Sequence, residues 1–250
     1  MMRRLGVRNL ARGVRAAVIV AVSTVLVAAL HGSSAATLGA LSSQALRAQD
    51  QAVAALAGTR LACDDFSLAA ATGAAMASRP VQLPANCGTG TWTSHTGTWS
   101  ITTGQAGSTS VANGNASFPV GSTDMSAEVT LLNANVAGRV GGVAVSHTGT
   151  TRIYVAGVVS ALNQVQLRFI NVNSVTTLAT ATATIGASTV LRLTRQGTAI
   201  TLRVDGVVAA TAVLTAAQVT SLALGTRAGL YTNTSATLRF SRIYVTTPFP

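Results

Sequence analysis

The fold is decided by one stretch of the C-terminal half, which begins Val190-Leu191-Arg192-Leu193-Thr194-Arg195, passes through Gln196-Gly197 and continues as Ile200-Thr201-Leu202-Arg203-Val204. Hydrophobic and polar side chains alternate along it with period two, which is the period of a strand and not of a helix. Asp205-Gly206 follows, and this dipeptide favours a type I′ turn, in which both central residues have positive φ. The stretch therefore predicts consecutive antiparallel strands joined by tight hairpins.

Short runs of the same kind, separated by Gly, Asn or Ser, recur from residue 91 to residue 245. Many short strands between turn signals are typical of a sandwich or barrel. We predict an all-β fold, a two-sheet antiparallel jelly-roll sandwich, with one helical turn at 215–222. The expected strands cover 91–93, 97–102, 117–120, 127–132, 139–146, 152–159, 164–171, 176–184, 190–194, 199–204, 207–214, 227–231 and 238–245.

Composition limits both the core and the partners. Hydrophobic residues make up 48% of the chain but aromatic residues only 4%, so the core must be built mainly from small aliphatic side chains. The net charge is +11, every basic residue is an arginine, and five arginines lie in the first 15 residues. The other arginines are spread along the strands, whereas a nucleic-acid-binding surface clusters them. We expect no nucleic-acid partner.

The N-terminus has the three parts of an export signal: basic residues up to Arg15, an uncharged apolar run over 16–30, and small residues up to Ala36. We divide the chain into a signal peptide or membrane anchor (1–36), a linker (37–60) and a β-sandwich (61–247). The apolar run is short for a membrane span, which favours cleavage. If it is retained as an anchor, this segment is the expected membrane contact. Both alternatives predict a secreted or cell-envelope, extracytoplasmic location.

Several motifs of the sandwich follow one another in a fixed order. Asp64-Asp65-Phe66 precedes Trp92 and Gly97-Thr98-Trp99-Ser100, and the hairpin at Asp205-Gly206 precedes the run Arg227–Tyr231. Their order and spacing resemble those of bacterial domains of the concanavalin A-like lectin/glucanase superfamily, in its laminin-G-like group. The resemblance implies a jelly roll whose first strand pairs near the last, and it implies glycan binding.

Catalysis is not expected from the acidic residues. Glycoside hydrolysis needs two carboxylates flanking one bond, and the chain has one glutamate, Glu128, and five aspartates. Asp124 and Glu128 would share one strand at a separation of about 13 Å, which is too long for such a pair. We interpret His95 and His147 as loop residues without a catalytic partner.

The candidate ligand-binding residues are aromatic platforms and amide side chains, namely Trp92, Tyr154, Tyr231, Asn133 and Asn233. Trp99 is expected in the core. The resemblance also suggests a calcium site, for which Asp64 and Asp65 would supply the hard oxygen ligands that Ca²⁺ prefers. The alternative is that the two aspartates only cap the first strand.

Together these features predict a non-catalytic, exported lectin-like module that binds a glycan or a cell-envelope component. The alternative is a structural or adhesive cell-surface protein without a sugar ligand.

Cys63 and Cys87 predict one disulfide, because an exported chain meets an oxidising environment. Closing a loop of about 25 residues would stabilise the fold by about 3 kcal/mol. Mass spectrometry of the exported protein without reductant should detect no free thiol. Two free thiols would contradict the pairing.

Overall fold

The alternating stretch forms the hairpins that its pattern predicts. In the computed structural model, strand β12 (Ser188–Gln196) pairs antiparallel with β13 (Ala199–Val204), which pairs with β14 (Val207–Val213). Buried positions alternate with more exposed ones along β12 and β13. Asp205 and Gly206 have φ angles of 47° and 84°, so the positive φ expected at both turn positions is confirmed.

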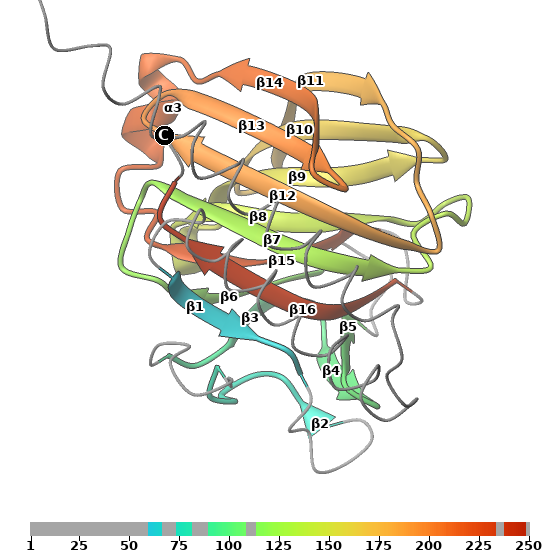
Figure 1. Cartoon of the computed structure of the whole chain (residues 1–250). Coiled ribbons are helices and arrows are strands. Elements are labelled where there is room, and N and C mark those ends of the chain that lie inside the picture. Colours follow the sequence, from blue (N-terminus) through green and yellow to red (C-terminus); the bar gives the residue numbers. More distant parts are fainter. Residues whose placement is uncertain (1–59, 67–73, 82–89, 109–113, 234–237, 249–250) are drawn as a thin grey trace, which may run out of the picture. The chain divides into compact units, whose positions relative to one another are not determined.

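The structure describes residues 60–66, 74–81, 90–108, 114–233 and 238–248, which all belong to one compact unit, residues 58–250. They form two antiparallel sheets, and Figure 1 shows one in front of the other. The predicted two-sheet sandwich is confirmed. The export segment, nearly all of the linker, and Cys87 lie outside the described residues. Within them, no helix has the length and apolar character needed to cross a membrane.

The sheet nearer the reader in Figure 1, here called the front sheet, is nine-stranded with the order β14-β13-β12-β7-β16-β5-β4-β2. Its remaining strand, β1, pairs with β16, which is the pairing of first and last strands that the motifs imply. The front-sheet strands not yet given are β1 (Arg60–Asp64), β2 (Ala74–Ala75), β4 (Trp99–Thr102), β5 (Gln105–Ser108), β7 (Met125–Leu132) and β16 (Arg239–Thr246).

The other sheet, the back sheet, is seven-stranded with the order β11-β10-β9-β8-β15-β6-β3. Chain neighbours from β8 to β11 are also neighbours in the sheet, whereas β15 inserts between β6 and β8. The strands are β3 (Thr93–Thr96), β6 (Gly114–Pro119), β8 (Val140–His147), β9 (Ile153–Ala161), β10 (Gln164–Asn171), β11 (Ser174–Thr182) and β15 (Arg227–Asn233).

Two short helical segments connect the strands. A 3-10 turn, η1 (Gly149–Thr151), leads into β9, and α3 (Ala216–Ser221) confirms the helical turn expected after β14. Thr215 caps α3 by accepting a hydrogen bond from the Gln218 N–H, and the Gln218 side chain accepts one from the Thr215 N–H in return. This capping box explains why the turn begins at Thr215.

Strands β1, β2 and β5 were not expected from the sequence. β5 (Gln-Ala-Gly-Ser) and β2 (Ala-Ala) have no hydrophobic alternation, and β1 lies ahead of the first expected strand at 91–93. Each is defined by its partner strand, since β1 pairs with β16, and β4 pairs with both β2 and β5.

A buried carboxylate ties the end of β1 to the segment before β3. Asp64 is fully buried, and its Oδ2 accepts hydrogen bonds from Trp92 Nε1 at 2.7 Å and Arg79 Nη1 at 3.1 Å. Its Oδ1 accepts the Phe66 N–H at 2.8 Å. Burial raises the pKa of the Asp64 carboxyl, while these hydrogen bonds and the Arg79 charge act in the opposite direction.

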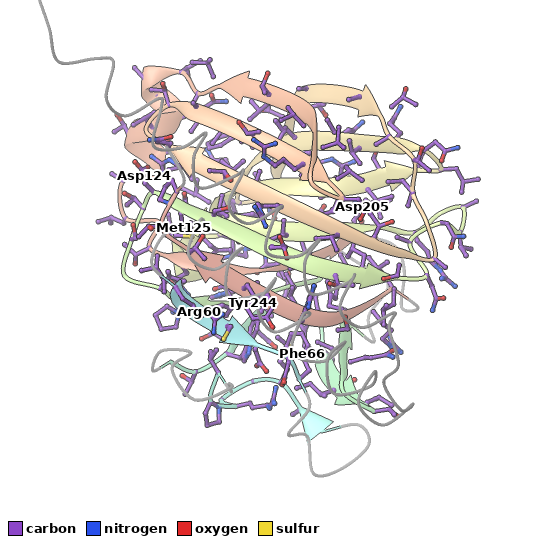
Figure 2. All side chains as sticks on the ribbon, in the orientation of Figure 1. Arg60, Phe66, Asp124, Met125, Asp205 and Tyr244 are labelled. Atoms are coloured by element: carbon purple, nitrogen blue, oxygen red, sulfur yellow. The ribbon has the colours of Figure 1, made fainter. Side chains whose placement is uncertain are left out.

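The front sheet carries a contrasting, more exposed ion pair. Glu128 on β7 faces Arg192 on β12, with Arg192 Nε 2.8 Å from Glu128 Oε2. Figure 2 places Arg60 beside Tyr244 on this sheet, with the guanidinium carbon 5.5 Å from the ring centroid.

We expect Asp64→Asn to lower the free energy of unfolding by about 3 kcal/mol, because it leaves the Arg79 guanidinium buried without its counter-charge. Urea denaturation at neutral pH measures this loss. The matched control is Glu128→Gln, for which we expect a loss of about 1 kcal/mol or less, since that pair is partly solvated. Equal losses in the two variants would contradict the structural role of Asp64.

Candidate functional site

The central strands of the back sheet, β6, β8, β9 and β15, are buried on both faces, whereas the edge strand β11 is largely exposed. Val143, Val145 and Val155 belong to the core cluster shared with the front sheet. The alternate positions on the same strands, which point the opposite way, form a second buried cluster of Ala144, Tyr154, Ala156, Val158, Ile170 and Tyr231. We call this side of the back sheet the pocket face.

Aromatic rings line up across the pocket face. The ring centroids of His95 and His147 are 4.5 Å apart, and those of His147 and Tyr154 are 4.6 Å apart with an interplanar angle of 11°. Tyr231 follows at 6.2 Å from Tyr154, with its ring tilted. The interpretation of both histidines as loop residues is wrong, because His95 lies in β3 and His147 in β8.

A hydrogen-bond chain holds the centre of this row. The Gly149 N–H donates to His147 Nδ1 at 2.8 Å, so a neutral His147 ring carries its proton on Nε2. Nε2 then donates to Asn115 Oδ1, and Asn115 Nδ2 donates to the Tyr154 hydroxyl, each at 3.3 Å. Asn115 therefore fixes both neighbouring rings.

The surroundings keep both imidazoles uncharged. Burial, together with the charges of Arg227 and Arg152, lowers the pKa of His95 to about 4. Burial lowers the pKa of His147 to about 2, with smaller contributions from His95, Arg227 and Arg152. Burial also raises the pKa of the Tyr154 hydroxyl above its usual value.

A pocket of about 220 Å³ opens beside these rings. Three of the lining residues are aliphatic, namely Ile170, Val172 and Val175. The others are aromatic or polar, namely Thr96, Asn115, Arg152, Tyr154, Asn173 and Tyr231. Such a mixed lining offers both apolar contact and hydrogen bonds to a small polar molecule.

Two residues of the pocket rim have unusual backbone angles. Arg152 and Val172 have φ angles of 52° and 56°, and the Val172 N–H donates to the Arg152 carbonyl at 3.2 Å. A β-branched residue rarely adopts positive φ. Such backbone strain is concentrated at functional sites in proteins, where the surrounding structure compensates for it.

Tyr231 gives the pocket an unsatisfied hydrogen-bonding group. Its side chain is 2% exposed, and its hydroxyl has no hydrogen-bond partner of good geometry among the described residues. Burial raises the pKa of this hydroxyl, while the nearby Arg168 and Asn233 side chains act to lower it. A buried hydroxyl without a partner is costly, and a bound polar ligand would supply the partner.

The structure brings together some of the residues selected from the sequence and separates others. Tyr154 and Tyr231 line the same pocket, and Asn233, at the end of β15, lies beside Tyr231.

The expected role of Trp92 as an exposed platform is wrong, because Trp92 is 1% exposed and donates to Asp64. Asn133 does not line the pocket; it lies in the turn after β7 with φ of 59°. Trp99 is buried as expected.

The aspartates suggested as calcium ligands are placed differently. Both oxygens of Asp64 accept hydrogen bonds from protein donors, and the Arg79 guanidinium lies where a cation would bind. The bond from the Phe66 N–H favours the capping interpretation of this pair. No group of three or more metal-ligating side chains is found within the described part of the chain.

Other residues of the site were missed by sequence reasoning, among them Thr96, Asn115, Arg152 and Asn173. They come from four separate segments that only the register of the back sheet places together, for example through the pairing of Thr96 and Tyr231 with Asn115. The one local signal was Arg152 preceding Tyr154 at the start of a strand.

No protein-family model and no curated protein matches the chain. Among solved structures it is similar to the carbohydrate binding module CBM66 from Bacillus subtilis, with a TM-score of 0.49, 14% identity, and coverage of 62% of this chain and 92% of that one. The Bacillus licheniformis beta-glucanase gives a TM-score of 0.47, 13% identity, and coverage of 76% and 99%. The galectin LEC-6 from Caenorhabditis elegans gives a TM-score of 0.39 and 12% identity, and the match covers 52% of this chain and 89% of that one.

These neighbours are concanavalin A-like jelly rolls, the fold class that the motifs predict. At such low identity and TM-score these matches do not support any function for this chain, and a function can be inferred only from the pocket.

The neutral histidines predict a pH-dependent stability. Their pKa values are lower in the folded chain than the usual 6.5, so the unfolded chain binds more protons below pH 6.5. The neutral histidines therefore make their full contribution to the free energy of unfolding above pH 6.5, and this contribution falls as the pH decreases. The part due to His95 stops falling below about pH 4.

Urea denaturation at pH 7 and pH 4.5 should show a smaller loss of stability in His95→Gln than in the wild type. An unchanged loss in the variant would contradict the neutral state of His95 in the folded chain.

Proposed function

We propose that this chain is a binding module that holds one sugar residue in the pocket on the back sheet. The observation that carries the proposal is the buried Tyr231 hydroxyl at the pocket, which makes no hydrogen bond of good geometry among the described residues, although Arg168 and Asn233 lie close to it. A ligand hydroxyl that pairs with it would remove the cost of leaving it unsatisfied.

The lining suits a sugar better than a purely apolar ligand. A sugar ring has an apolar face of C–H groups and an edge of hydroxyls. Ile170, Val175 and the Tyr154 ring offer apolar contact, while Asn115, Asn173 and Thr96 offer amide and hydroxyl groups. The pocket of about 220 Å³ is small, which favours a compact ligand such as a single ring.

The same lining supports binding and not hydrolysis. Hydrolysis by a carboxylate pair needs two acids at one bond, and none of the described residues that line the pocket is acidic. Asp124 and Glu128 lie at the front sheet, where each is close to an arginine of β12. We therefore place the chain among non-catalytic lectin-like modules, with a glycan of the cell envelope or its surroundings as the partner.

The test compares sugar binding by the wild type and by a variant that lacks only the Tyr231 hydroxyl. The purified chain is screened on an array of soluble oligosaccharides, and binders are measured by titration calorimetry. We expect Tyr231→Phe to bind about 10-fold more weakly, which corresponds to ~1.4 kcal/mol. Its melting temperature should stay the same or rise, because the variant removes an unsatisfied buried group.

Tyr244→Phe is the matched control, since Tyr244 lies on the front sheet against Arg60 and Arg242. It should bind like the wild type. If the folded protein binds no sugar on the array, the glycan-binding proposal is wrong, and the alternative of a structural or adhesive surface protein takes its place.

A further inference from the structure

Both sheets carry arginines, but the acidic residues that lie in strands are confined to the front sheet. The seven strands of the back sheet contain no aspartate and no glutamate, yet Arg168 and Arg227 lie in them and Arg152 directly precedes β9. On the front sheet, by contrast, Arg192 pairs with Glu128, and Arg195 lies 3.8 Å from Asp124. Among the described residues, no carboxylate lies within ion-pair distance of the three back-sheet arginines.

Arg152 brings one of these charges into the pocket lining. Its guanidinium has five N–H donors, and the hydrogen bond that the structure gives its side chain is from Nη2 to Asn173 Oδ1 at 3.2 Å. The positive φ of Arg152 and the hydrogen bond from Val172 to its carbonyl hold its backbone at the rim. A planar guanidinium with unused donors matches an anionic oxygen pair.

The other two arginines strengthen the positive potential around the pocket. Arg168 lies close enough to Tyr231 to lower the pKa of its hydroxyl, and Arg227 lowers the pKa of both histidines. Arg227 is held by neutral acceptors, donating to Ser117 Oγ at 2.8 Å and to Thr93 Oγ1 at 2.9 Å. Its own pKa is lowered by burial, as expected for a cation without a counter-charge.

We propose that the pocket selects a negatively charged sugar residue, whose anionic group binds the Arg152 guanidinium while its neutral hydroxyls meet Tyr231 and Asn115. The inference rests on the proposed function, because it names the chemical class of sugar that the same pocket takes. The anionic group is a carboxylate, as in a uronic acid, or a sulfate ester, and both offer the oxygen pair that a guanidinium recognises.

The experiment compares each charged sugar with its neutral counterpart on the full chain. Calorimetry is carried out with galacturonate, its methyl ester, galactose 6-sulfate and galactose, and with the corresponding glucose series. At least one anionic sugar should bind 10-fold or more tightly than its neutral counterpart. That preference should decrease as sodium chloride is raised, because salt screens the charge. The better ligand of galacturonate and galactose 6-sulfate identifies the anionic group.

Arg152→Gln removes the charge and keeps a polar amide on a shorter side chain. We expect the ratio of the affinities for the anionic and the neutral sugar to fall to about one. The control Arg203→Gln changes an arginine of the front sheet that donates to the Gly206 carbonyl, and it should preserve the preference.

The possible failures are distinguishable. Sugars that bind in a Tyr231-dependent way with equal affinity for charged and neutral forms would overturn the charge selectivity and leave the proposed function intact. A preference that survives Arg152→Gln would overturn the role of Arg152. No binding of any sugar, charged or neutral, would overturn both proposals.

Discussion

The burial of the central back-sheet strands on both faces is the constraint from which the site follows. One face packs against the front sheet. The side chains of the other face, among them Tyr154 and Tyr231, form a second buried cluster. The strands beneath that layer approach very closely: a Cβ on Gly142 of β8 would lie 2.0 Å from the Gly157 carbonyl oxygen of β9. Small residues in β8 and β9 therefore allow the sheet to form, and the large aromatic side chains cover it.

A covered pocket face requires that its polar groups be satisfied without water. His147 and Asn115 achieve this together, since the imidazole accepts from Gly149 and donates to Asn115, which donates to Tyr154. The network uses neutral groups throughout, in agreement with the lowered pKa of His147. Tyr231 stands outside this network, and its hydroxyl makes no hydrogen bond of good geometry among the described residues.

The arrangement of charge separates a structural role from a binding role. The buried Asp64–Arg79 pair and the Glu128–Arg192 pair join segments of the chain, and both involve front-sheet strands. The arginines of the back sheet have neutral partners such as Asn173, Gln166 and Ser117. Within the described residues, these two ion pairs join segments of the chain, whereas the arginines around the pocket are held by neutral groups.

The sequence by itself determined the fold class, the hairpin at Asp205-Gly206 and the helical turn after Thr215, because alternation, turn chemistry and capping are properties of adjacent residues. It also selected Tyr154 and Tyr231. It placed Trp92 wrongly, since nothing local distinguishes a core indole that donates to Asp64 from an exposed one. Only the tertiary structure decided the site, because the register of β3, β6 and β15 joins Thr96, Asn115 and Tyr231. Such register depends on contacts between distant strands, and so does the choice of which face each tyrosine occupies.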